Sequence, residues 1–164
     1  MTTPMDGIRI LELTRVGPGA FCTRLMADMG AEVIKIDSPD DPVRGSRGTD
    51  REQRIRRQGL DRNKKSIVLD LKQRSSQEVF HKLAATADVV LEGFRPGIAT
   101  RLGVDYDTIH AINPRIVYCS LSGYGQTGPY KDLPGHDINY MAMSGALDMI
   151  GPRGGAPVEP LNLI

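Results

Sequence analysis

The stretch GIRILELTRVGPGAFCTRLMADMGAEVIKID, residues 7–37, decides the fold class. It predicts an apolar strand over Ile8–Leu13, a glycine-rich turn, a helix over Ala20–Met29 and a second strand over Glu32–Asp37. Two short apolar strands joined through a helix are typical of neighbouring parallel strands. This segment therefore predicts the first unit of an α/β protein.

The rest of the chain continues the alternation of strands and helices. Further strands are predicted over Ser66–Leu71, Asp88–Glu92 and Ile116–Leu121. Further helices are predicted over Ser75–Ala87, Ile98–Leu102, the residues after Asp105 to Ile112, and Ile138–Ile150. Ser75 with Glu78 has the spacing of a capping box, and Asp105 and Asp137 are predicted as N-caps. The order predicts an α/β fold with a mainly parallel sheet flanked by helices.

Length and composition limit the class of protein. The chain has 164 residues, of which 40% are hydrophobic and 25% are charged, the balance of one globular domain. It has no secretory signal pattern and no apolar run long enough to span a bilayer, so we expect a cytoplasmic protein that does not associate with a membrane. Cys22, Cys119 and the three histidines show no metal-ligand spacing; we expect reduced, buried thiols and no metal.

A basic stretch occupies Arg44–Lys65, within a region (residues 43–65) that we expect to be a long polar loop. It holds nine basic and three acidic residues, an excess of six positive charges in a chain whose net charge is +1. Such a segment can attract a polyanion, which would be the phosphates of a coenzyme or nucleic acid. The alternative is that it forms a solvated surface without a ligand. It contains no aromatic residue on which bases could stack, which argues against single-stranded nucleic acid.

Three further motifs could carry chemistry. Gly135-His136-Asp137 opens a predicted helix, whose first backbone amides face outward. There the imidazole could remove a proton α to a carbonyl while the amides stabilise the oxyanion. The alternative is a loop histidine packed against the start of the helix. Gly17-Pro18-Gly19 could present amides to a phosphate or be a plain turn. The glycines of Ser122–Pro129 allow close backbone approach to a ligand or form a lid.

Taken in order, several runs of the sequence resemble one family. They are GIRILEL with GPG (7–19), LMADMGAEVIKID (25–37), NKKSIVLDLK (63–72), DVVLEGFRPG (88–97), LSGYGQTGP (121–129) and GHDINY (135–140). The chain is similar over nearly its whole length to the family III CoA-transferase / α-methylacyl-CoA racemase superfamily. GHDINY and the terminal PLNL (160–163) favour the racemase branch. The resemblance implies a Rossmann-like fold in which residues 1–164 are the N-terminal CoA-binding part of the large α/β domain. The rest of that domain and a small domain would be missing.

The resemblance also implies roles for residues. His136 would be one of two acid/base residues of a 2-methylacyl-CoA racemase, with the Asp137 N–H as donor to the thioester oxygen and a partner aspartate beyond residue 164. Alternatively, a family III CoA-transferase would use an aspartate acyl-enzyme there; a non-enzymatic polyanion-binding module is the remote alternative.

The implied partner is an acyl-CoA thioester in an interlocked homodimer of the full-length protein. No cofactor beyond the CoA moiety, no metal and no nucleic acid are implied. The implied CoA contacts are Val16, Leu69, Asp70, Leu71, Lys72, Gly93, Phe94, Arg95, Arg101, Gly135 and Tyr140.

Overall fold

A computed structural model describes residues 2–14, 17–40 and 59–160 of the chain. The chain divides into two units, Met1–Leu121 and Ser122–Ile164.

The first unit is built on a parallel sheet. Its described strands are β1 (Arg9–Leu13), β2 (Glu32–Asp37), β3 (Lys64–Val68), β4 (Val89–Glu92) and β5 (Val117–Ser120). They lie in the order β3-β2-β1-β4-β5, and every neighbouring pair is parallel. The predicted α/β fold with a mainly parallel sheet is thus confirmed.

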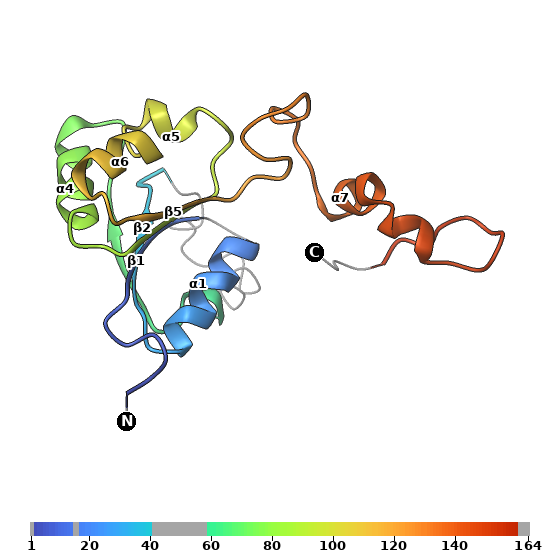
Figure 1. Cartoon of the computed structure of the whole chain (residues 1–164), viewed down its shortest axis with the longest axis horizontal. Helices are drawn as coiled ribbons and strands as arrows, with labels where there is room; N and C mark the ends of the chain where they lie inside the picture. Colours follow the sequence, from blue (N-terminus) through green and yellow to red (C-terminus); the bar gives the residue numbers. More distant parts are fainter. Residues whose placement is uncertain (1, 15–16, 41–58, 161–164) are drawn as a thin grey trace. The chain divides into compact units, whose positions relative to one another are not determined.

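Helices cover both faces of this sheet. They are α1 (Pro18–Asp28), α4 (Arg74–Ala84), α5 (Ile98–Arg101) and α6 (Tyr106–Ile112). Figure 1 shows α1 on one face and α4, α5 and α6 on the other. The larger apolar cluster lies on the α4 side and includes Leu11, Phe80, Val90 and Ile109, all fully buried. The cluster on the α1 side is smaller and is centred on Ile10 and Val33.

Two boundaries differ from the predictions made on the sequence. β3 begins at Lys64 and ends at Val68, whereas a strand over Ser66–Leu71 was expected. Lys64 enters the strand because its ammonium group has a buried carboxylate partner, as described below. The helix α4 begins at Arg74 with Gln73 as its N-cap, so Ser75 already lies within the helix and the expected capping box is not formed.

The N-terminus of α6 was predicted correctly. Asp105 is its N-cap; its carboxylate accepts hydrogen bonds from the N–H of Thr108 at 3.3 Å and from the Thr108 hydroxyl at 2.8 Å. The cap orients the first turn so that Ile109 lies fully buried in the core.

We expect Asp105→Ala to lower the free energy of unfolding by about 1 kcal/mol, because the Thr108 N–H loses its acceptor. Asp107→Ala is the matched control: Asp107 lies exposed in the same turn and contributes only through the helix dipole, so about 0.3 kcal/mol is expected. Urea titration measures both, and equal losses would contradict a capping role for Asp105.

The second unit contains the helix α7 (Asp137–Ser144) and a 3₁₀ turn at Ala146–Met149. The helix was expected to run to Ile150. It ends earlier because Gly145 takes a left-handed conformation with φ 79°. Asp137 was expected as the N-cap, but His136 has the extended cap conformation and Asp137 is the first helical residue.

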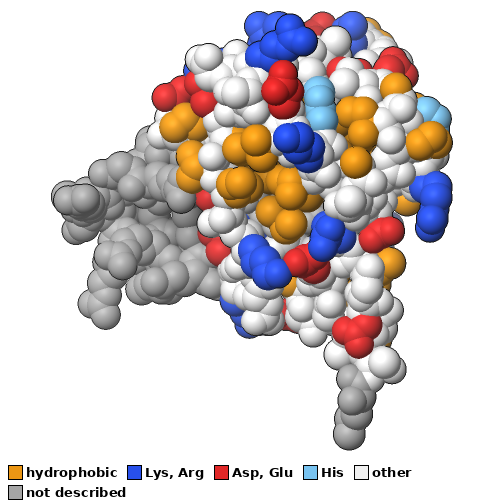
Figure 2. Space-filling view, turned by 90° about the vertical axis from the view of Figure 1, so that its left-hand side faces the viewer, with side chains coloured by type: hydrophobic (Ala, Val, Ile, Leu, Met, Phe, Trp, Pro, Cys, Tyr) orange, Lys and Arg blue, Asp and Glu red, His pale blue; other side chains and the backbone are white. Residues whose placement is uncertain are grey.

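The surface of the first unit carries exposed apolar side chains. Figure 2 shows such side chains gathered on one side of the first unit. Val79 on α4 and Tyr106 and Ile112 on α6 are exposed. Both cysteines are free, and neither is buried as expected: Cys22 is half-buried, and Cys119 is exposed because β5 is the edge strand of the described sheet. No helix in the described ranges is long and apolar enough to cross a membrane.

Candidate functional site

The carboxyl ends of β1 and β4 meet at the centre of the sheet. β1 pairs with β2 on one side and with β4 on the other. The chain leaves β1 toward α1 on one face, and leaves β4 toward α5 and α6 on the opposite face. Ligands of open parallel sheets bind at such a switch point, because the diverging loops leave room between them. We therefore place one candidate site at the turns that follow β1 and β4.

The turn from β1 to α1 is shaped by glycine. Gly17 has φ 75°, a left-handed conformation, and Pro18 begins the helix. A Cβ atom on Gly19 would lie 2.5 Å from Cγ2 of Thr14 and 3.2 Å from Cδ2 of Leu91. Glycine thus lets the first turn of α1 approach the ends of β1 and β4. Val16, an expected CoA contact, lies outside the described residues.

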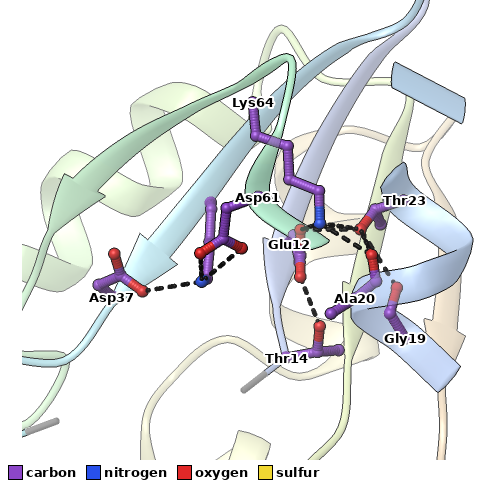
Figure 3. Close-up of polar contacts among 9 residues, drawn as sticks. Glu12, Thr14, Gly19, Ala20, Thr23, Asp37, Asp61 and Lys64 are labelled. Atoms are coloured by element: carbon purple, nitrogen blue, oxygen red, sulfur yellow. Dashed lines mark hydrogen bonds and ion pairs between the residues drawn. The ribbon is translucent and has the colours of Figure 1, made fainter. Parts of the chain in front are cut away.

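A buried polar cluster lies under the first turn of α1 (Figure 3). Glu12 on β1 is fully buried, and its carboxylate forms an ion pair with Lys64 Nζ at 2.8 Å. The Thr14 hydroxyl donates to Glu12 Oε1 at 2.6 Å, and the Thr23 hydroxyl donates to Glu12 Oε2 at 2.8 Å. Lys64 Nζ also donates to the Ala20 carbonyl at 2.9 Å and to Thr23 Oγ1 at 2.8 Å. The cluster joins β1, β3 and α1 next to the candidate site.

A second buried cation lies on the same face of the sheet. Lys35 pairs with Glu12 in the register of β1 and β2. Its ammonium group contacts both oxygens of Asp61, at 2.8 and 2.9 Å, and lies 3.6 Å from Asp37. Asp61 thereby holds the residues just before β3 against β2.

The described part of the predicted basic stretch is neutralised within the fold. Arg62 forms an ion pair with Asp28 on α1, and Lys65 pairs with Glu32 at 2.6 Å. The hydrogen bond from Arg62 holds the pKa of Asp28 below its usual range, and the hydrogen bonds from Lys65 and Arg9 do the same for Glu32. The remaining arginines of the stretch, from Arg44 to Arg57, lie outside the described residues.

Glu92 shapes the turn after β4. Its side chain is buried, and its carboxylate accepts a hydrogen bond from the Phe94 N–H at 2.6 Å. Gly93 is exposed, and Phe94 packs its ring against the larger core cluster. Arg95 follows on the surface, and Arg101 is exposed at the end of α5; within the described ranges neither forms an ion pair with a carboxylate. These two guanidinium groups are the expected CoA contacts best able to bind phosphate.

The predicted contacts at residues 69–72 follow the carboxyl end of β3. Leu69 and Leu71 are buried in the larger cluster, so their side chains are taken up by the core. Asp70 accepts a hydrogen bond from the Lys72 N–H at 3.1 Å. Lys72 is exposed and forms an ion pair with Asp40 at 2.8 Å. Leu69 and Leu71 could therefore meet a ligand only through their backbone.

His136 lies at the entrance of α7 in the second unit. Its side chain is exposed, and its N–H donates to Asn139 Oδ1 at 2.9 Å while its carbonyl accepts from the Asn139 N–H at 2.9 Å. Asn139 thus fixes the backbone of His136 and leaves the imidazole at the surface. The first-turn N–H groups of a helix point outward along its axis, and Asp137 supplies the first of them. This geometry places an imidazole beside the positive end of a helix.

Tyr140 packs against the glycines that precede α7. A Cβ atom on Gly135 would lie 2.6 Å from Tyr140 Cε1, and one on Gly123 would lie 2.2 Å from the Tyr140 hydroxyl oxygen. The Tyr124 ring lies edge-on at 5.3 Å from the Tyr140 ring. Gly135 and Tyr140 thereby fix the segment that carries His136 within the second unit.

The buried cluster around Glu12 was missed in the sequence. The signal was present: an acidic residue inside the apolar strand ILEL must find a partner, because an unpaired buried carboxylate is too costly. The partner, Lys64, is 52 residues away and could not be identified without the sheet order. In the described part of the chain, no group of three or more His, Cys, Asp or Glu side chains could hold a metal ion.

A parallel sheet with helices on both faces is the architecture of doubly wound α/β proteins. The family model of CoA-transferase family III matches residues 5–163, and the chain belongs to this family.

Curated relatives include both kinds of activity. The chain is 41% identical over 160 residues to the alpha-methylacyl-CoA racemase of Homo sapiens, covering 98% of this chain and 39% of the relative. It is also 41% identical over 160 residues to the succinyl-CoA:glutarate CoA-transferase of Mus musculus, covering 96% and 37%. Among solved structures, a CaiB/BaiF family protein from Brucella suis matches with a TM-score of 0.85 and 34% identity, covering 98% of this chain and 44% of that one. The chain thus spans under half the length of these relatives.

Proposed function

We propose that this chain is part of an enzyme acting on acyl-CoA thioesters, and that the reaction is the racemisation of a 2-methylacyl-CoA. Membership of the family and the CoA thioesters named in the relatives support the substrate class. Arg95, in the turn after β4, and Arg101, at the end of α5, are exposed and supply cations for the phosphates of CoA.

The exposed imidazole of His136 at the entrance of α7 is the observation that carries the racemase proposal. In this mechanism a ring nitrogen takes the α-proton, and the electron pair of the C–H bond moves to the thioester oxygen to form an enolate. The N–H of Asp137 and the helix dipole stabilise that oxygen. Return of a proton to the opposite face completes the inversion and needs a second acid, which we assign to none of the described residues.

CoA transfer between carboxylic acids is the second candidate function. A CoA-transferase relative is as similar to this chain as a racemase relative, with 41% identity in both cases. Transfer proceeds through an acyl-enzyme and needs a carboxylate nucleophile rather than a base at residue 136.

Deuterium exchange distinguishes the two reactions. We expect the full-length gene product, incubated in heavy water with one enantiomer of a 2-methylacyl-CoA, to introduce deuterium at the α-carbon and to form the other enantiomer without added carboxylic acid. Mass spectrometry and chiral chromatography measure both changes. Absence of exchange, together with CoA transfer that depends on an added carboxylic acid, would instead establish the transferase.

Two properties of the whole protein belong to this proposal. We propose an interlocked homodimer and a cytoplasmic location, both from the family resemblance and the composition of the chain. Sedimentation of the full-length protein tests the first, since a monomer would exclude it. Cell fractionation tests the second, since recovery in an organelle would exclude it.

A further inference from the structure

The ion pair between Glu12 and Lys64 is more deeply buried than any other ion pair in the described part of the chain. The side chains are 0% and 1% exposed, whereas the neighbouring pair of Lys65 and Glu32 is 71% and 33% exposed. Burial of two charges is costly, and apolar side chains of similar size would often serve stability equally well. The location of the pair therefore suggests a use beyond stability.

The bonds of this pair converge on the candidate site. Glu12 holds the hydroxyl of Thr14, the first residue after β1, at 2.6 Å. The methyl group of Thr14 lies where Cβ atoms on Gly19 and Gly93 would contact it, at 2.5 and 3.4 Å. Thr14 thus lies between the first turn of α1 and the turn that follows β4.

Lys64 holds the other side of the same site. Its ammonium group donates to the Ala20 carbonyl in the first turn of α1 and to the Thr23 hydroxyl one turn later. No other cation in the described part of the chain bonds to Glu12. Without Lys64, the first turn of α1 would lose a bond to β3, and Glu12 would be left as an unpaired charge beneath it.

Charge gives this contact a second consequence. A helix N-terminus attracts anions, but an unpaired carboxylate just below it opposes that attraction. Lys64 cancels the charge of Glu12, so that the turn remains favourable for an anionic ligand.

We propose that Lys64 is a positioning residue for CoA binding at the carboxyl ends of β1 and β4. It acts by neutralising Glu12 and by tying the first turn of α1 to β3. This inference rests on the proposed function, because it takes CoA as the ligand of that site.

The test compares three variants of the full-length protein, with CoA itself as the probe in titration calorimetry. Lys64→Met is expected to raise the Kd for CoA by about tenfold or more, within the range of coupling between linked sites. The double variant Lys64→Met with Glu12→Gln removes both charges but does not restore the bonds from Lys64 to Ala20 and Thr23. Its Kd for CoA is therefore expected to lie between those of the wild type and Lys64→Met. Lys65→Met, the neighbour in β3 with an exposed ion pair, is expected to leave the Kd unchanged.

Steady-state kinetics separates positioning from a loss of folded protein. Positioning of the CoA moiety raises KM and leaves kcat nearly unchanged, because Lys64 touches no reacting atom. A merely structural role lowers the fraction of active enzyme and hence the apparent kcat, with KM unchanged. If Lys64→Met does not fold by circular dichroism, the double variant decides, since it leaves no unpaired charge.

The outcomes are distinguishable. A wild-type protein that does not bind CoA would overturn the proposed function. A wild-type protein that binds CoA, together with a double variant whose Kd and KM equal the wild-type values, would overturn the positioning role while leaving the proposed function intact.

Discussion

Replacement of His136 by alanine is expected to slow α-proton exchange by about 10²–10⁴-fold, the usual contribution of a positioned general base. The imidazole is exposed at the entrance of α7, and the Asn139 side chain accepts a hydrogen bond from the His136 N–H. Removal of the ring should therefore take away the base without disturbing the helix. The rate is measured as deuterium incorporation from heavy water into a 2-methylacyl-CoA.

The matched variant His136→Gln tests whether the ring or its volume matters. Glutamine retains a polar side chain of moderate size but cannot accept and return a proton, so exchange should be lost as in the alanine variant. Binding of CoA should be unchanged in both, which shows that the fold persists. Exchange at the wild-type rate in either variant would exclude His136 as the base.

The sequence predicted the sheet well because its strands are short apolar runs. β2 has the predicted bounds, Glu32–Asp37, and β4 differs from its prediction by one residue. Local pattern sufficed here, because strands covered on both faces are rich in apolar residues. The parallel direction of the strands followed from their alternation with helices along the chain.

The predictions failed where distant residues decide the local structure. Lys64 and Lys65 look like loop residues, yet they open β3 because Glu12 and Glu32 lie across the sheet to receive them. The charge count over Arg44–Lys65 likewise did not reveal that Arg62, Lys64 and Lys65 each meet a carboxylate of the fold, because those carboxylates are distant in the sequence. The predicted N-cap of α7 was wrong for another reason. His136 rather than Asp137 takes the cap position, and the Asn139 side chain accepts a hydrogen bond from the His136 N–H.

The two faces of the sheet differ in how much apolar surface they bury. The face under α1 combines a small apolar cluster with the buried polar groups around Glu12. The opposite face holds the larger cluster under α4, α5 and α6. Because apolar burial is the main source of stability, the stability of the first unit should depend mostly on the α4 side.

Phe80→Ala is therefore expected to lower the free energy of unfolding by about 3–5 kcal/mol, through lost burial and the cavity that remains. Phe80 is 0% exposed and is the largest of the fully buried side chains of the described residues. Its neighbour Val79 is 38% exposed, and Val79→Ala should change stability by only about 0.5 kcal/mol. Both values come from urea titrations followed by circular dichroism. A loss below about 1 kcal/mol for Phe80→Ala would contradict a dominant core on this side, because even partial collapse of the cavity leaves most of the lost burial uncompensated.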